Sequence, residues 1–341
     1  MLPLPNYCSN SSSVAHNFTL FFLPITFLIE TPIAWFGVYC ILKLTPKHLL
    51  QAKILLLAHE FWVTFYSAVI CISLVPVAFF PYIGFYSQGI FDKFEVNLEY
   101  IVYAIGTGFG GMFFSILCLF AYRHQSVLPQ THALKLKPGH FTLLAIFIHG
   151  ATLLIMIPFS LYHPHQYHEV SLLSLQTAYS TPPCDLWHPR LLIYWFGFRE
   201  ILIGYTGFFA GCSGLMAFYV AHSYRIIKVY QRITSKGTRK RQIGFLYALT
   251  LMASIPNVCL LFPTIAFVVC KNNSADDYHE GLSDAIVCVV GLHGLLSTGT
   301  MIFSHKPYRK EAQGVIQRII CMKTNEKKVW PGDVTKTAKF Y

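Results

Sequence analysis

Charged side chains are scarce in this chain. Only 12% of its 341 residues are Asp, Glu, Lys or Arg, whereas 54% are hydrophobic and the mean hydropathy is +0.49. Soluble domains carry about 25% charged residues, so this chain has too little polar surface to cover a soluble core. The composition excludes a soluble domain and predicts a membrane protein.

The chain also lacks the residue patterns of catalysis. It has no HExxH, GxSxG or P-loop motif, and its ten cysteines form no CxxC pair. We therefore expect no enzyme activity and no cofactor. The segment 163–169, HPHQYHE, contains residue types that bind zinc, but a solvated loop is the better interpretation, and we expect no metal site.

Long apolar runs make up most of the chain. A helix needs about 20 apolar residues to cross the hydrocarbon layer, and seven runs are long enough. The runs are residues 18–42, 50–80, 96–122, 141–162, 191–221, 243–270 and 282–303. No Lys or Arg precedes the first run, so we expect an uncleaved first span. The sequence thus predicts an all-α membrane protein with a seven-helix bundle at 18–303, between an N-terminal segment 1–17 and a tail 304–341.

The basic residues are distributed unevenly between the two sides of this bundle. Of the 26 Lys and Arg residues, 22 lie at the cytoplasmic ends of the spans or in the tail when the N-terminus is placed outside. The excess of 11 positive charges is therefore topogenic and does not indicate a nucleic-acid partner. The glycosylation sequons at Asn10, Asn17 and Asn272 all lie on the predicted outer side, which supports the same orientation.

Two basic groups mark the predicted cytoplasmic side. Arg123 ends the third span, where it serves either as a switch that contacts a G protein or only as a marker of the membrane edge. Lys240 and Arg241 lead into the sixth span, where they suit anionic lipid headgroups, an acidic partner surface or both. The seventh span ends abruptly at the basic, proline-broken segment 305–309.

Four ionisable residues lie inside apolar runs: Glu30, Glu60, Arg199 and Glu200. A charge in the bilayer centre costs a few kcal/mol, so these groups should face the bundle interior, pair with one another or take up a proton. A pair between Arg199 and Glu30 or Glu60 would line an outward-opening cavity. A purely structural pair between helices is an equal alternative.

Several segments resemble a known family, the nematode serpentine receptors of class H. The resemblance spans nearly the whole chain and rests on residues 31–33, 37–42 with 45–46, 61–62, 181–183, 293–298 and 305–309. It implies a seven-helix receptor of the G-protein-coupled type, with Arg123 at the basic end of span three and Pro307-Tyr308 at the switch of span seven. The chain departs from the family pattern at Ala121, Glu60 and Cys184. The sequence therefore does not decide whether the chain has an acid–Arg lock or the outer disulfide.

The resemblance implies a chemoreceptor in the cell membrane of sensory neurons. Its expected partners are a small external chemical, a heterotrimeric G protein and membrane lipids. Candidate ligand-facing residues are Trp62, Tyr103, Arg199, Glu200 and Tyr205. The alternatives are a seven-helix transporter or ligand-gated channel, for which Glu30, Glu60 and Arg199 would begin a polar path, and a membrane enzyme, which ranks last.

Overall fold

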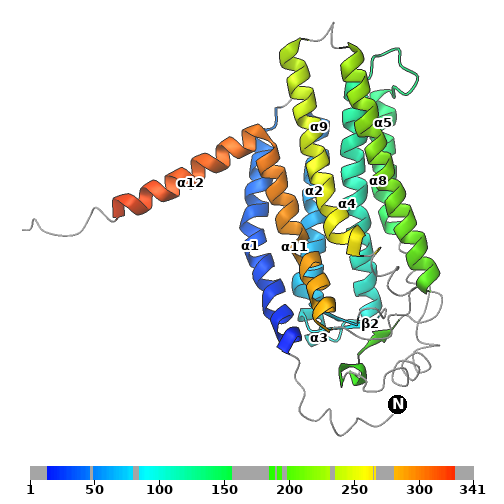
Figure 1. Ribbon diagram of the computed structural model, residues 1–341, viewed down its shortest axis with the longest axis vertical. Helices are drawn as coiled ribbons and strands as arrows, with labels where there is room; N and C mark the ends of the chain where they lie inside the picture. Colours follow the sequence, from blue (N-terminus) through cyan, green and yellow to red (C-terminus); the bar gives the residue numbers. More distant parts are fainter. Residues whose placement is uncertain are drawn as a thin grey trace, which may run out of the picture.

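The computed structural model describes residues 14–46, 49–79, 84–155, 184–188, 190–193, 198–230, 235–263, 265 and 280–326. Long helices lie side by side, a small sheet lies at one end of the bundle, and α12 projects from the other end (Figure 1). The elements are α1 Val14–Leu44, α2 Leu50–Ala68, η3 Val69–Leu74, β1 Pro76–Ala78, β2 Gly84–Ser87, α3 Ile90–Lys93, α4 Leu98–Val127, α5 Pro138–Ile155, η5 Cys184–Trp187, β3 Leu192–Ile193, α8 Phe198–Val229, α9 Lys236–Pro256, η7 Asn257–Leu261, α11 Glu280–Ser304 and α12 Lys306–Glu326.

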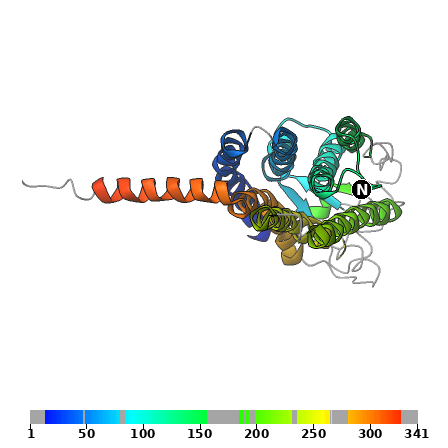
Figure 2. The ribbon, with the colours of Figure 1, turned by 90° about the horizontal axis from the view of Figure 1, so that it is seen from above.

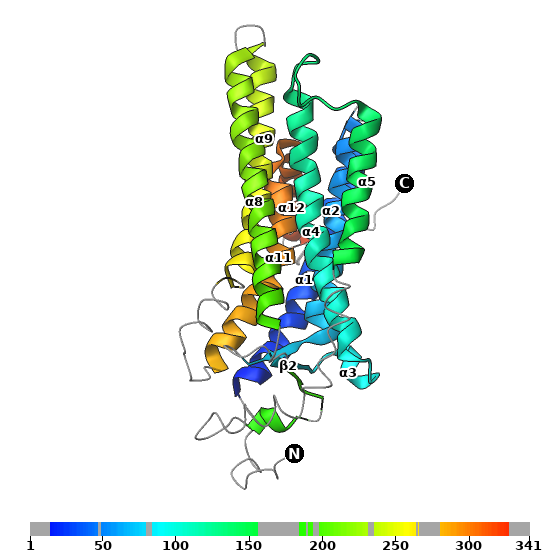
Figure 3. The same cartoon turned by 90° about the vertical axis from the view of Figure 1, so that its right-hand side faces the viewer.

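Six of these helices are long and apolar enough to cross a membrane. They are residues Asn17–Leu44, Leu50–Leu74, Leu98–Val127, Ile203–Val229, Lys236–Leu261 and Gly281–Ser304. The shorter apolar helix α5 lies beside α2 and α4 and is the seventh (Figure 3). Each of the seven overlaps one of the predicted spans.

Two predicted spans differ from the helices at their outer ends. The second was predicted to reach residue 80, but its helix ends at Leu74, because Val75 adopts a left-handed conformation (φ 43°) and Pro76 follows it. The fifth was predicted to begin at residue 191, but Leu192 and Ile193 form a strand, and α8 begins at Phe198. In both places the apolar run continues into the small sheet.

The small sheet has three antiparallel strands in the order β1-β2-β3. It was not predicted from the sequence. Its first two strands pair Val77 with Tyr86, and β3 adds Leu192 opposite Phe85. The sheet lies at the predicted outer end of the bundle, because α1 and α11 both begin there, whereas α8 ends and α9 begins at the opposite end (Figure 1).

Helix α4 is the most buried of the candidate spans. It packs against α2, α5, α8 and α9, as the view along the bundle shows (Figure 2). A side chain at Gly111 would overlap the indole of Trp62, so glycine is what allows α2 and α4 to approach this closely. Asn97 caps the helix, since its side chain accepts a hydrogen bond of 2.9 Å from the backbone N–H of Glu99.

Two membrane helices contain a π-helical turn. The segment η3 continues α2, with the N–H of Val75 bonded to the carbonyl of Ile70, and η7 continues α9 directly after Pro256. A proline lacks the N–H of a regular ladder, which explains the irregular hydrogen bonding of α9 at this point.

Candidate signalling and ligand-binding sites

Arg123 lies near the predicted cytoplasmic end of α4 and points toward α9. Its guanidinium carbon is 5.3 Å from the ring centre of Phe245, and Nη1 donates a hydrogen bond of 3.1 Å to the hydroxyl of Ser126. Its buried Nε and Nη2 have no hydrogen-bond partner within the described part of the chain. A cation over an aromatic face contributes about 0.5–2 kcal/mol, so this contact ties α9 to α4.

The ring of Phe245 continues this contact toward α11 and α12. It meets His305 edge to face at 5.5 Å, and His305 stacks on Tyr308 at 5.1 Å. The hydroxyls of Tyr308 and Thr45, at the end of α1, share a hydrogen bond of 2.5 Å. Four elements are thereby joined side chain to side chain. We call Arg123, Phe245, His305, Tyr308 and Thr45 the aromatic relay.

The two titratable rings of the aromatic relay lie just outside the spans. Burial lowers the pKa of His305, and its hydrogen bond to the carbonyl of Met301 (3.0 Å) offsets only part of that effect. Burial raises the pKa of Tyr308, and the bond to Thr45 opposes the rise. At neutral pH both rings are therefore uncharged, which suits their stacking.

The other predicted switch residues are not members of the aromatic relay. Lys240 and Arg241 are exposed in the first turns of α9, which Ser235 caps by accepting from the N–H of Thr238 at 3.2 Å. Pro307 is exposed in the first turn of α12, where a missing N–H costs nothing. Phe245 and Thr45 were not predicted as switch residues, because nothing in the sequence marks which aromatic ring or hydroxyl will face a given partner.

The carboxylate of Glu60 is buried between α2 and α11. Thr298 of α11 donates a hydrogen bond of 2.7 Å to its Oε1, and Glu60 is only 2% exposed. Gly37 of α1 leaves room for this pair, since a side chain there would press on Thr298. One residue earlier, His59 places Nδ1 2.9 Å from the hydroxyl of Ser115 on α4.

Glu30 of α1 is fully buried and faces α11. A side chain at Gly294 would overlap both Glu30 and Ser67, so this glycine makes the space for the carboxylate. Neither oxygen of Glu30 has a hydrogen bond of good geometry among the described residues, and neither nitrogen of the buried His293 does. Both carboxylates thus lie between α1, α2 and α11, whereas Arg199 belongs to α8, which packs on α4 and α9.

The predicted ligand-facing residues lie on different faces of the bundle. Trp62 packs on Gly111 and on its helix neighbours Phe61 and Phe65. Tyr103 turns toward α5, where its hydroxyl donates to the carbonyl of Leu153 at 2.8 Å. Tyr205 is half-buried against the core. Arg199 and Glu200 occupy the first turn of α8, and their side chains lie outside the described part.

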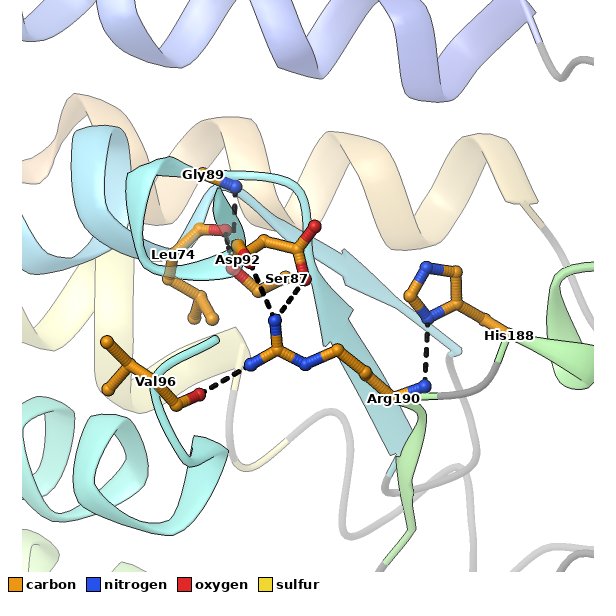
Figure 4. A network of polar contacts seen from close by, with 7 residues as sticks. All are labelled: Leu74, Ser87, Gly89, Asp92, Val96, His188 and Arg190. Atoms are coloured by element: carbon orange, nitrogen blue, oxygen red, sulfur yellow. Dashed lines mark hydrogen bonds and ion pairs between the residues drawn. The ribbon is translucent and has the colours of Figure 1, made fainter. Parts of the chain in front are cut away.

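A polar network fastens the small sheet to the bundle at the predicted outer end (Figure 4). Arg190 donates to the carboxylate of Asp92 at 2.7 Å, to the carbonyl of Asp92 at 2.8 Å and to the carbonyl of Val96 at 2.6 Å. Beside it, Tyr86 of β2 stacks on His188 at 4.0 Å. The segment before α8 is therefore held across the start of α4.

The same network closes the outer end of α2. The carbonyl of Leu74 accepts from the N–H of Gln88. It also accepts from the N–H of Gly89 and from the hydroxyl of Ser87 (Figure 4). Gly89 is required because a side chain there would overlap the backbone of Ser73. The helix end, which would otherwise leave carbonyls unpaired, is satisfied by the turn after β2.

A histidine pair joins α4 to α8 near the predicted cytoplasmic end. Nε2 of the buried His124 lies 2.8 Å from Nδ1 of His222, and the ring of His132 is 5.5 Å from that of His222. This group was not predicted from the sequence. Within the described residues, no three His, Cys, Asp or Glu side chains are arranged to hold a metal ion.

Several predicted features lie partly or wholly outside the described residues. Asn10, Asn272 and the histidine-rich segment 163–169 belong to these, whereas Asn17 is exposed in the first turn of α1. Cys184 is disulfide-bonded, with a partner beyond the described part of the chain. The six cysteines at positions 40, 71, 118, 212, 259 and 288 are free.

The helices and their order define a seven-transmembrane-helix bundle. The crystal structure of squid rhodopsin is similar, with a TM-score of 0.57 at 10% sequence identity, over 94% of this chain and 90% of that chain. At this identity the likeness shows the fold alone. No significant match was found among curated proteins.

The family follows from the sequence itself. The model of the family described as serpentine type 7TM GPCR chemoreceptor Srh matches residues 14–318. The chain belongs to this family of receptors, and the resemblance noted from residues 293–298 and 305–309 is confirmed.

Proposed function

We propose that this chain is a chemosensory receptor of the cell membrane that binds an external chemical and activates a heterotrimeric G protein. The family match over residues 14–318 carries the proposal. The aromatic relay supports it, because the relay begins at an arginine and passes through Tyr308 of α12 to Thr45 at the end of α1, all at the predicted cytoplasmic face. The N-terminus lies outside and the basic tail inside, following the distribution of Lys and Arg.

The proposed mechanism is a shift between two packings of α9. In the structure described here, Arg123 lies over Phe245 and holds the cytoplasmic part of α9 against α4. A ligand that binds better to a state in which α9 has moved away would release Arg123 toward the G protein. No acidic side chain is needed for this restraint, which accounts for Ala121 in place of the acidic residue of an acid–Arg lock.

The proposed ligand region is the outer half of the bundle, beneath the small sheet. Trp62, Tyr103, Arg199, Glu200 and Tyr205 remain its candidate residues. Because Trp62 fills the space at Gly111 and Tyr103 bonds to α5, we expect these two to act through helix packing. Tyr205, Arg199 and Glu200 of α8 are then the candidates for direct contact.

The Arg123→Ala variant tests the switch. We expect it to reach the cell surface normally and to lose G-protein signalling in cells that respond to a chemical through the wild-type receptor, as measured by cAMP or calcium. Arg123→Lys should signal weakly, since an ammonium lacks the planar, multiply donating guanidinium that we expect to contact the G protein after release. Lys43→Ala, another basic residue at a predicted cytoplasmic edge, is the matched control and should signal normally. Normal signalling by Arg123→Ala at equal surface density would disprove the switch.

A transporter or ligand-gated channel is the second candidate function. The observation that favours it is the pair of buried carboxylates, Glu30 and Glu60, between α1, α2 and α11. A current evoked by the same chemical in cells without G proteins, and abolished by Glu60→Gln, would favour this candidate over the receptor.

A further inference from the structure

A groove of about 640 Å³ runs along the outside of the bundle between α9 and α11. It is lined on one side by Gly244, Tyr247 and Leu251 and on the other by Leu296, Gly299 and Phe303. Tyr247, Leu296 and Phe303 are 64%, 43% and 55% exposed. Since all of them lie in candidate spans, the groove opens toward the hydrocarbon layer rather than toward water.

Two glycines line this groove, one on each wall. A Cβ built on Gly244 or on Gly299 would meet no atom within 4 Å, so the protein leaves both positions open. At Gly111, in contrast, the neighbouring helix fills the space. The gap between α9 and α11 is therefore not closed by side chains, and a molecule from the bilayer must occupy it.

The cytoplasmic end of the groove is cationic. Arg309 lines this end and is exposed. One N–H of its guanidinium donates to the carbonyl of Phe303 at 3.3 Å, which leaves its other N–H groups for other acceptors. Lys306 and Lys310 are exposed in the same turn of α12.

We propose that this groove is a binding site for an anionic phospholipid. An acyl chain lies between α9 and α11, over Gly244 and Gly299, and the headgroup, which carries a net negative charge, accepts hydrogen bonds from Arg309. The charge distinguishes this occupant from a sterol, which has no anionic group to place at Arg309. A lipid bound here touches the turn of α9 that carries Phe245, the ring beneath Arg123.

Photolabelling tests the site on the full-length chain in phosphatidylcholine nanodiscs. Two probes carry the same diazirine acyl chain, one with a phosphatidylserine and one with a phosphatidylcholine headgroup. Labelled residues are located by mass spectrometry. We expect labels to concentrate at residues 247–255 and 295–303, and the anionic probe to label about five-fold more strongly, as one favourable charge contact implies.

Two kinds of variant separate the acyl chain from the headgroup. Gly299→Leu and, on the opposite wall, Gly244→Leu should fill the groove and remove most of its labelling by either probe. Gly214→Leu is the matched control, because Gly214 of α8 is also open, and it should leave the labelling unchanged. Arg309→Gln should reduce labelling by the anionic probe to the level of labelling by the neutral probe. Lys228→Gln should not reduce it, because Lys228 is exposed at the end of α8, away from the groove.

Four outcomes would overturn the proposal. Equal labelling by the two probes in the wild type would show that the groove has no preference for anionic lipid. Labels spread evenly over all helices would show that no specific lipid site exists. Displacement of the anionic probe by a sterol would identify a sterol groove. Displacement by soluble glycerophosphoserine would show that the headgroup alone binds. Because the two glycines lie on different helices, failure of one variant to fold leaves the other to decide.

Discussion

The hydrogen bond between Glu60 and Thr298 joins residues 238 positions apart in the sequence. Both side chains are buried, so the carboxyl of Glu60 has exchanged water for this hydroxyl. A buried acceptor that loses its partner costs more than the bond itself contributes. The pair is therefore a sensitive probe of how α2 and α11 pack.

We predict that Thr298→Val lowers the free energy of unfolding by about 1–3 kcal/mol, because valine keeps the shape but cannot donate to Glu60. The measurement is thermal unfolding of the purified receptor in nanodiscs. Thr250→Val is the control, since that exposed threonine bonds only to a carbonyl of its own helix, Leu246. It should change stability by no more than about 0.5 kcal/mol. Equal effects of the two variants would contradict the prediction.

His305 makes the stability of the cytoplasmic end dependent on pH. Since burial lowers its pKa, the folded state binds the proton more weakly than the unfolded chain does. The contribution of neutral His305 to stability is then fully present above the ordinary histidine pKa of about 6.5, and it falls as the pH drops below that value. We predict that lowering the pH from 7.5 to 5.5 lowers the melting temperature of the wild type by about 2 °C more than that of His305→Gln. Parallel pH curves for the two proteins would show that His305 has the same pKa in the folded and unfolded states.

Hydropathy alone identified the unusual residues but not their partners. Glu30 and Glu60 were predicted as notable because charges are rare in apolar runs, and Arg123 because it stands at the basic end of the third span. Which hydroxyl or ring faces each of them depends on the rotation of the facing helix, and a one-residue error turns a helix by about 100°. Thr298 and Phe245 therefore emerged only from the three-dimensional arrangement.

Among the elements, the small sheet depends most on a single side chain. Arg190 makes three hydrogen bonds that fix the segment carrying β3 to α3 and the start of α4. Its ion pair with Asp92 is about one-third exposed, so the charge itself contributes little. The two bonds to backbone carbonyls are the larger part of the restraint.

We predict that Arg190→Gln increases hydrogen exchange of residues 184–193 about ten-fold, because the loss of these bonds makes local opening easier by about 1.4 kcal/mol. Asp92→Asn should have a much smaller effect, since Arg190 keeps both backbone carbonyls. Exchange measured by mass spectrometry distinguishes the two variants. If Asp92→Asn opened the segment as much as Arg190→Gln, the ion pair would be the main restraint.

The ends of two helices were harder to predict than their existence. An apolar run gives the same signal whether it continues a helix or enters a buried strand. Residues 75–80 and 191–193 are apolar in either case, and Val75 ends its helix through a backbone conformation that valine rarely adopts. The helix ends there because Gly89 and its neighbours pair with the carbonyl of Leu74, a contact made 15 residues further along the chain.

At the scale of the whole molecule, the orientation follows from charge. We predict that an epitope tag at the N-terminus is detected on intact cells, whereas a tag at the C-terminus is detected only after permeabilisation. Immunofluorescence with both tags on one chain is the measurement. Detection of both tags on the same face would mean an even number of crossings and would remove the basis of the receptor assignment.

The bundle itself was well predicted from the sequence, because hydrocarbon imposes one requirement on every span. Each of the seven helices overlaps a predicted run, including α5, of which the described part is short. The groove between α9 and α11 was not foreseen, since no pattern in the sequence shows that Gly244 and Gly299 will face outward along one seam.

The π-helical turns in α2 and α9 affect any comparison with other receptors. A turn closed by an i to i+5 hydrogen bond holds about one residue more than an α-helical turn. Positions beyond Val69 and beyond Asn257 are therefore rotated relative to a helix that lacks the extra residue. Residue equivalences transferred from a regular helix must be offset by one from these points outward, and mutants chosen without that offset would test the wrong face.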